Sequence, residues 1–332
     1  MSPSRRDFLK LGACGMGIAA LSRFSTLGAS EPNPFAYKVD HLAKTDPKLI
    51  RFDQVQAWKC TLSRPRQVAI GAGDRIYVAC AKGIAVFGPD AALVTEIATR
   101  GPVRCLAVAK DGSVFAGLRS SVEVFDASLK SVSAWEVPEK KAWLTGVAVS
   151  DNDVFLADSG NRVILRYDRA GKRVKRIGEK DKDRNVPGLI APSPYLEVKI
   201  APDGLLRVNN TGRHKVESYT FDGDLEFAWG KPTAAIEGFC GCCNPIGIAM
   251  LPDGRHVTCE KGLPRVKVYT AAGEFESVVA GPESFPENAR TGSVRDASDR
   301  TMGGLHAAVD STGRITVLDL ATGDVKTFKA KT

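Results

Sequence analysis

Residues 145–167 read TGVAVSDNDVFLADSGNRVILRY, and this stretch decides the fold. It contains an apolar run, a polar turn, a second apolar run, a polar loop and a third run that ends in Tyr167. Short runs of this kind, rich in Val, Ile and aromatic residues and bounded by Asp, Asn and Gly, indicate strands joined by hairpins. The stretch therefore predicts three consecutive antiparallel strands.

The same pattern recurs along most of the chain. Five further copies end in Tyr or Phe, and they occupy residues 66–87, 104–125, 196–219, 246–269 and 305–328. In most copies a turn containing Gly or Asp leads on to a fourth strand, such as residues 225–229. Four antiparallel strands repeated about six times are typical of a β-propeller.

The last copy has three strands, which leaves its blade without an outer one. Residues 49–56, LIRFDQVQ, precede the first copy and alternate as a strand does. Pairing this segment with the last copy would remove exposed strand edges that invite aggregation. We therefore predict an all-β, six-bladed β-propeller over residues 48–332, closed by an N-terminal strand that completes the C-terminal blade.

Two segments carry a family resemblance. Residues 156–163, LADSGNRV, and residues 208–213, VNNTGR, resemble the NHL repeat, and residues 242–269 are similar to a group of exported bacterial NHL-like proteins of undefined role. The NHL fold is similar to that of sugar-lactonase and strictosidine-synthase-like propellers. Since the fold hosts binding modules as well as enzymes, the resemblance leaves the activity open.

The N-terminus resembles a twin-arginine (Tat) signal peptide. Residues 4–10, SRRDFLK, precede a short apolar run at residues 11–21, and small residues at 28–30 suit signal peptidase. The resemblance implies a signal peptide over residues 1–30, export of the folded chain by the Tat translocase, and a periplasmic or extracellular location. The apolar run is too short to span a membrane as a stable helix, and we expect no membrane span after cleavage. We interpret residues 31–47 as an N-terminal extension.

The charge pattern argues against nucleic acid as a partner. The net charge is +8, and it falls to +5 when the first thirty residues are removed. The basic residues are dispersed and do not interleave with aromatic residues as a stacking platform requires. The sequence also lacks a Gly-x-Ser-x-Gly elbow, an HExxH motif, a phosphate loop and a dinucleotide fingerprint.

Residues 238–245, GFCGCCNP, hold three of the eight cysteines. In a propeller, the connections between blades emerge on the same face as the loops between second and third strands, here called the loop face. We therefore expect Cys240, Cys242, Cys243 and Cys259 to meet there and to bind an iron–sulfur cluster, zinc or another metal. The alternative is that they form structural disulfides, as cysteines do in oxidising compartments. We interpret Cys60, Cys80 and Cys105 as small core residues or a structural pair.

Other polar residues fall at equivalent positions of the repeat. Glu197 and His306 begin first strands at the channel mouth, where they could act as acid and base, bind a cation or line a solvated channel. A second set begins the loops between second and third strands and could either line the mouth or cap its own turns. Its members are Asp158, Asn210, Glu260 and Asp319.

These observations leave three functions open. The leading hypothesis is a binding protein that holds a protein or a small-molecule ligand on the loop face, with the cysteine-lined metal or redox site. The second is a hydrolase or lyase resembling the sugar-lactonase propellers, which implies a divalent cation such as calcium on Glu197, Asn210 and Asp319. The third is a protein-interaction scaffold with structural disulfides. Residues 181–195 and 283–303 are long connections between blades. The second is polar and contains Gly, as a cover over the mouth would be, and the alternative is a solvent-exposed insertion with no role.

Overall fold

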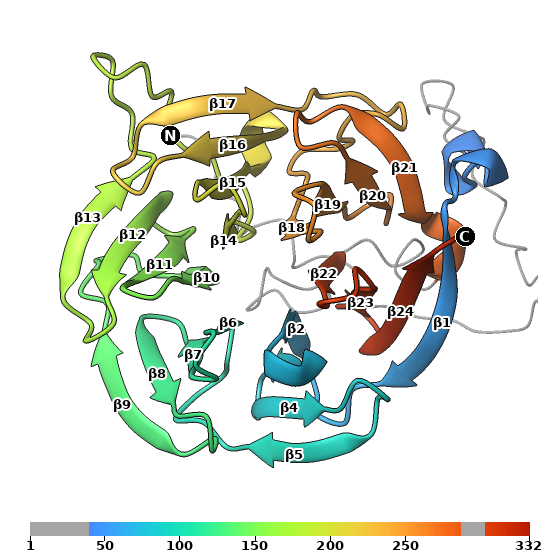
Figure 1. Cartoon of the computed structure of the whole chain (residues 1–332). Coiled ribbons are helices and arrows are strands. Elements are labelled where there is room, and N and C mark those ends of the chain that lie inside the picture. Colours follow the sequence, from blue (N-terminus) through green and yellow to red (C-terminus); the bar gives the residue numbers. More distant parts are fainter. Residues whose placement is uncertain (1–39, 287–302) are drawn as a thin grey trace, which may run out of the picture. The chain divides into compact units, whose positions relative to one another are not determined.

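The computed structural model describes residues 40–286 and 303–332, which belong to one compact unit, Val39–Thr332. In these residues, 24 strands form six four-stranded antiparallel sheets around a central axis (Figure 1). The fold is a six-bladed β-propeller, as predicted. The predicted signal peptide and residues 31–39 of the extension lie outside the described residues. No helix in the described part of the chain has the length and apolar character needed to cross a membrane.

The first three blades follow the chain from the inner strand to the outer one. Blade 1 contains β2 (Pro65–Ile70), β3 (Ile76–Cys80), β4 (Gly83–Phe87) and β5 (Leu93–Ile97). Blade 2 contains β6 (Cys105–Val108), β7 (Val114–Gly117), β8 (Ser121–Phe125) and β9 (Ser131–Glu136). Blade 3 contains β10 (Leu144–Val149), β11 (Asp153–Asp158), β12 (Val163–Asp168) and β13 (Arg173–Ile177).

The next two blades repeat this order, and the last takes its outer strand from the N-terminal side. Blade 4 contains β14 (Val198–Ile200), β15 (Leu206–Asn210), β16 (Lys215–Tyr219) and β17 (Leu225–Trp229). Blade 5 contains β18 (Gly247–Met250), β19 (His256–Cys259), β20 (Val266–Tyr269) and β21 (Phe275–Ala280). Blade 6 contains β22 (Leu305–Val309), β23 (Ile315–Asp319), β24 (Asp324–Ala330) and β1 (Phe52–Lys59).

The closing strand β1 pairs antiparallel with β24, from Phe52 opposite Ala330 to Lys59 opposite Asp324. It begins at Phe52, three residues later than the segment the sequence indicated. The reason is local: Pro47–Leu49 form a 3₁₀ turn, which the Asp46 side chain caps by accepting the Lys48 N–H at 2.9 Å. Other short 3₁₀ turns occupy Asp40–Ala43, Ala72–Asp74, Thr211–Arg213 and Pro282–Ser284.

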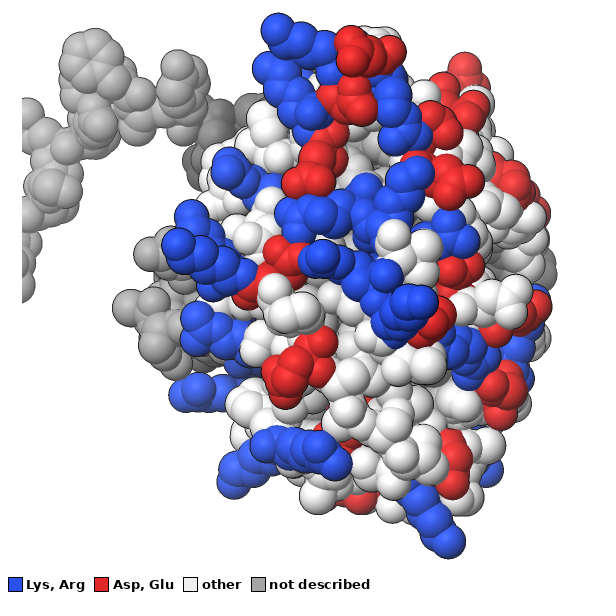
Figure 2. Space-filling view, turned by 90° about the vertical axis from the view of Figure 1, so that its left-hand side faces the viewer, with Lys and Arg blue, Asp and Glu red and all other residues white. Residues whose placement is uncertain are grey.

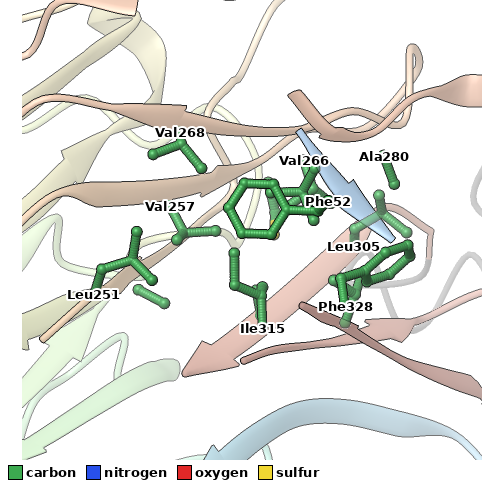
Figure 3. Packing of buried hydrophobic residues seen from close by; sticks show 14 of the residues in the cluster. Phe52, Leu251, Val257, Val266, Val268, Ala280, Leu305, Ile315 and Phe328 are labelled. Atoms are coloured by element: carbon green, nitrogen blue, oxygen red, sulfur yellow. The ribbon is translucent and has the colours of Figure 1, made fainter. Parts of the chain in front are cut away.

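The core lies between neighbouring blades. Six clusters of buried apolar residues each join one blade to the next, and Figure 3 shows the cluster between blades 5 and 6. Because each blade is covered on both faces, inner strands such as β3 are buried at every position and do not alternate. The aromatic residues that close the repeats are all buried: Phe87, Phe125, Tyr167, Tyr219, Tyr269 and Phe328.

The outer strands carry the charge. On the side of the disc that bears β13, basic side chains are numerous but acidic ones lie among them (Figure 2). Arg176 and Arg173 contact Glu139 at 2.6 and 2.8 Å, and Arg166 contacts Asp153 at 2.8 Å. These three arginines therefore have acidic partners, and the absence of a nucleic-acid partner stays a prediction.

Candidate functional site

The centre of the channel is organised by one carboxylate. Glu197 lies just before β14 and is 2% exposed. Its Oε1 accepts hydrogen bonds from His306 Nε2 at 2.7 Å, Lys199 Nζ at 2.7 Å and Gln67 Nε2 at 3.0 Å. Its Oε2 accepts the Ile248 N–H at 2.8 Å. The structure thus brings Glu197 and His306 into direct contact, although they lie 109 residues apart in sequence.

The network continues to the backbone of other inner strands. His306 Nδ1 accepts the Val68 N–H at 3.4 Å, so the ring proton is on Nε2, which donates to Glu197. Gln67 Oε1 accepts the Leu106 N–H at 2.6 Å. Inner strands have an edge without a strand partner, and these side chains satisfy the N–H groups along it. The carboxylate and its neighbours consequently connect blades 1, 2, 4, 5 and 6.

The charge state of Glu197 follows from these contacts. Burial raises the pKa of this carboxyl group, but the electrostatic attraction of His306 and Lys199 and the hydrogen bonds that both donate outweigh burial and lower the pKa of Glu197 to about 2. Glu197 is therefore ionised at neutral pH and its oxygens are already occupied. A cation at this position would also have to approach the Lys199 ammonium.

Two cavities open at the loop face beside this network. A small chamber of about 40 Å³ is lined by Arg66, Arg104, Tyr195, Glu197 and His306 among others, a volume that accommodates only a few water molecules. A larger hollow of about 410 Å³ lies next to it, and Pro194 lines both. The hollow therefore has room for a small organic molecule, and the chamber does not.

The larger hollow lies between blades 3 and 4, and Trp143 is its one aromatic lining residue. Its other lining residues are Lys141, Ser159, Gly160, Ala191, Pro192, Ser193 and Pro194. The guanidinium groups of Arg104 and Arg119 lie 4.1 and 4.8 Å from the centre of the Trp143 ring. Two guanidinium groups thus lie against the Trp143 ring, although neither arginine lines the hollow, and Lys141 lines the hollow together with Trp143.

The four residues predicted to begin the outer loops are engaged in local turns. Asp158 accepts the N–H groups of Trp143, Gly160 and Asn161 at 3.0 to 3.2 Å. Asn210 accepts the Ile190 N–H at 3.0 Å, and Asp319 accepts the Ala321 and Thr322 N–H groups at 2.8 and 3.2 Å. The structure therefore places Asp158, Asn210 and Asp319 in their own blades, each holding a loop.

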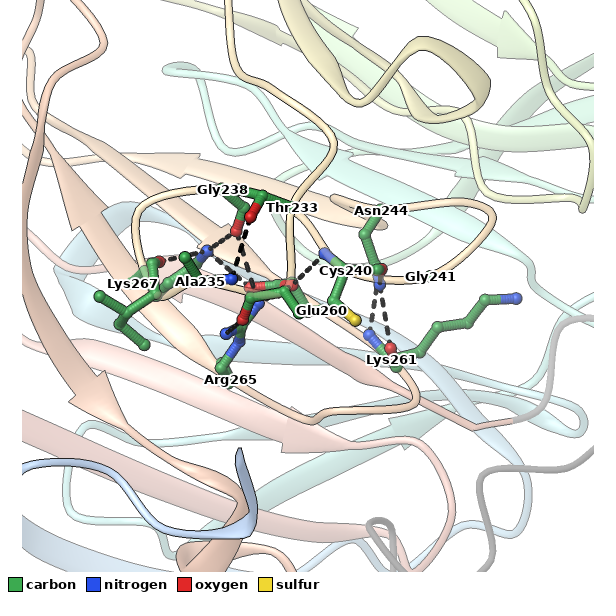
Figure 4. Close-up of polar contacts among 12 residues, drawn as sticks. Thr233, Ala235, Gly238, Cys240, Gly241, Asn244, Glu260, Lys261, Arg265 and Lys267 are labelled. Carbon is green, nitrogen blue, oxygen red and sulfur yellow. Dashed lines mark hydrogen bonds and ion pairs between the residues drawn. The ribbon is translucent and has the colours of Figure 1, made fainter. Parts of the chain in front are cut away.

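Glu260 differs from the other three because it is paired with two cations. It is fully buried and contacts Lys267 Nζ at 2.7 Å and Arg265 Nη2 at 2.7 Å (Figure 4). Lys267 also donates to the carbonyl groups of Ile236 and Gly238, and Glu260 accepts the Cys240 N–H at 3.3 Å. This buried triad therefore supports the segment that leads into the cysteine loop, residues 240–243.

The structure does not gather the four cysteines into one centre. Cys242 is exposed and Cys243 is buried, and their sulfur atoms lie 3.2 Å apart. Cys259 faces the apolar cluster between blades 5 and 6, and burial raises its pKa well above the ordinary value. Among the described residues, no group of three or more His, Cys, Asp or Glu side chains could hold a metal ion.

The remaining cysteines occupy the core. Cys60 and Cys80 lie between blades 6 and 1 with their sulfur atoms 3.5 Å apart, and Cys105 is buried between blades 2 and 3. All seven cysteines of the described residues are free thiols.

Sequence reasoning missed several of the residues that matter here. Lys199 follows Glu197 by two positions, and residues two apart on a strand share a face, so this signal was present. Lys267 and Arg265 interrupt an apolar strand with charge, which indicates a buried acidic partner. Trp143 gave no pattern signal, because its environment depends on residues of other blades.

Comparisons with known proteins identify the fold only. A streptogramin B lyase structure matches with a TM-score of 0.59 and 12% identity, over 85% of this chain and 98% of that one. Virginiamycin B lyase from Staphylococcus aureus matches with a TM-score of 0.56 and 14% identity, over 84% of this chain and 100% of that one. A catalytically inactive histidine-to-alanine variant of that enzyme with quinupristin matches with a TM-score of 0.55 and 13% identity over the same shares. No family model matches the sequence, and no curated protein does.

Proposed function

We propose that this propeller is a binding protein whose ligand is a small anionic organic molecule held in the hollow on the loop face. The observation that carries the proposal is the combination of volume, aromatic surface and charge around Trp143. The hollow measures about 410 Å³, within the range of small-ligand sites. Lys141 on the lining, and Arg104 and Arg119 against the Trp143 ring, provide positive charge near an anionic group, and the part of the indole that lines the hollow provides a surface for a planar apolar part.

Binding can be measured by calorimetry with matched pairs of aromatic carboxylates and their neutral amides. We expect the carboxylates to bind and to weaken with added salt, because the attraction is electrostatic. Arg119→Gln is expected to reduce their affinity about tenfold, which corresponds to about 1.4 kcal/mol, since it removes one positive charge beside the Trp143 ring. Trp143→Ala should weaken carboxylates and amides alike.

Arg75→Gln is the matched control, because Arg75 is exposed in the loop before β3, which joins a first strand to a second and so emerges on the opposite face. Equal affinity for each carboxylate and its amide, or equal losses in the Arg119 and Arg75 variants, would rule the proposal out.

A lyase is the second candidate. The contact between His306 and Glu197 on the channel axis favours it, and so does the fold shared with propellers that act as streptogramin B lyases. Against it, both ring nitrogens of His306 are already engaged, by Glu197 and by the Val68 N–H. Conversion of quinupristin by the purified chain, abolished in His306→Ala, would establish this activity. If mass spectrometry shows that quinupristin is unchanged, this activity is excluded.

The cysteine-lined metal site is a weaker proposal, because the donors do not fit one ion. Lys261 lies beside Cys243, and its positive charge opposes a cation there. Cys259 belongs to the apolar core between blades 5 and 6. Metal analysis of anaerobically purified protein tests the proposal, and a stoichiometric metal that is lost in Cys242→Ser would restore it.

Export by the Tat route rests on the sequence alone. Replacing Arg5 and Arg6 together by lysine is expected to retain the chain in the cytoplasm, since the paired arginines are what the translocase reads. Cell fractionation measures this, with Arg23→Lys as the control. Undiminished export of the double variant would contradict the assignment.

A further inference from the structure

We propose that Cys242 and Cys243 form a redox-active pair that exchanges with small-molecule disulfides, with Lys261 and Ser193 holding the buried member. The inference does not require a ligand in the hollow, although Ser193 also lines it. It rests on the geometry of the cysteine loop, which the channel network does not include.

The two thiols are adjacent and unequal. Their sulfur atoms lie 3.2 Å apart, yet Cys242 is exposed and Cys243 is 1% exposed. An incoming molecule therefore reaches Cys242 first, and Cys243 is positioned behind it. Unequal access of this kind separates an attacking thiol from a resolving one.

The surroundings of Cys243 favour a thiolate. Lys261 Nζ donates to Ser193 Oγ at 3.2 Å and lies 4.5 Å from the centre of the Tyr195 ring, which fixes the ammonium in this corner. Burial raises the pKa of Cys243, but hydrogen bonds from Ser193, Cys242 and Lys261 and the Lys261 charge outweigh burial and lower it. A nearby cation activates a thiol as a nucleophile and disfavours metal binding at the same place.

The loop itself is held in position from both sides. Asn244 donates to the carbonyl groups of Cys240 and Lys261 and accepts the Lys261 N–H at 2.9 Å, so Lys261 is fixed to the same loop as the thiols (Figure 4). Below it, the Glu260 triad supports Cys240. The pair is thus presented on a supported loop.

A disulfide RSSR would react with the pair in two exchange steps. Cys242 passes its proton to the Cys243 thiolate, and the resulting Cys242 thiolate attacks one sulfur of RSSR and forms a mixed disulfide. The other half leaves as RS⁻, takes up the proton from Cys243 and departs as RSH. The Cys243 thiolate then attacks the Cys242 sulfur and expels the second half as RS⁻. Two electrons pass from the cysteine pair to RSSR, which leaves as two thiols.

The test treats the full chain with oxidised glutathione, followed by alkylation and peptide mass spectrometry. We expect the mass of the wild type to fall by two hydrogen atoms, because a Cys242–Cys243 disulfide forms. Dithiothreitol should reverse this change. Cys243→Ser should accumulate one glutathione on Cys242, and Cys242→Ser should form neither product. Lys261→Met should slow formation of the intramolecular bond about tenfold, because loss of one adjacent charge changes the thiolate population by about that factor.

Two controls come from the same chain. Cys240→Ser, in the same loop, should react as the wild type does. The Cys60–Cys80 pair, with sulfur atoms 3.5 Å apart but buried, should take up no glutathione. Pairing of Cys240 with either neighbour, a stable adduct on wild-type Cys242, or no reaction in folded protein, verified by circular dichroism, would each overturn the proposal.

Discussion

Glu197→Gln is expected to lower the free energy of unfolding by about 3–5 kcal/mol, the range for breaking a buried ion pair by removing one partner. The substitution removes the charge that Lys199 and His306 face, and an amide cannot accept all four of the hydrogen bonds that the carboxylate accepts. Urea unfolding at neutral pH measures the effect. Because Glu197 links inner strands of several blades, the loss should be cooperative and not confined to blade 4.

The stability that Glu197 contributes should also depend on pH. In the unfolded chain Glu197 takes up a proton near its ordinary pKa of 4.5, whereas in the folded chain it does so only near 2. Between these values the unfolded state binds more protons, so the stability that Glu197 contributes is present above pH 4.5 and is lost as the pH falls to 2. The shift corresponds to about 3 kcal/mol.

We therefore expect the difference between wild type and Glu197→Gln to shrink across that interval. Glu226→Gln is the control, because Glu226 is exposed on β17 and should change stability by less than about 0.5 kcal/mol. A loss at Glu197 no larger than the loss at Glu226 would show that the carboxylate does not organise the channel.

Glu260→Gln is expected to be comparably damaging, by about 3–5 kcal/mol, because it leaves two buried cations without an anion. Lys267 and Arg265 have side chains that are 0% and 3% exposed. Adding Lys267→Met to this variant should recover about 1 kcal/mol or more, since it removes one uncompensated charge. Denaturant unfolding of the four proteins in the cycle measures the coupling.

The stability contributed by this triad changes at alkaline pH, whereas the stability contributed by Glu197 changes at acidic pH. Burial lowers the pKa of Lys267 to about 8, although the charge of Glu260 raises it. From pH 8 to the ordinary lysine value of 10.5, the unfolded state binds the proton that the folded state has released, so the contribution of Lys267 to stability rises with pH. Lys267→Met should abolish that rise. Additive losses in the cycle, with an unchanged pH profile, would argue against a coupled triad.

Much of the fold was predictable from the sequence because its signals are local. Each repeat carries its own strands, turns and closing aromatic residue, and six copies of a unit that cannot bury both faces alone require a ring. The alignment of the copies also placed Glu197, just before β14, and His306, in β22, at equivalent positions. What it could not supply was their contact, since that depends on blades 109 residues apart.

The direction of the Cys259 side chain could not be predicted from the repeat. Topology places Cys259 and Glu260 at the same end of β19, but consecutive residues on a strand point to opposite faces. Cys259 consequently enters the apolar cluster against blade 6, and Glu260 meets Lys267 and Arg265. The metal prediction placed Cys259 with Cys240, Cys242 and Cys243 on the loop face, whereas its side chain lies in the core between blades 5 and 6.

The sequence by itself determined the repeat, the number of blades and the residues that line the axis, because hydrophobic period and turn chemistry are properties of neighbouring residues. Only the tertiary structure decided which carboxylate is shared by several blades, which thiols are adjacent and where Trp143 meets two guanidinium groups. Those contacts join side chains from different repeats, and their geometry depends on how closed blades pack against one another.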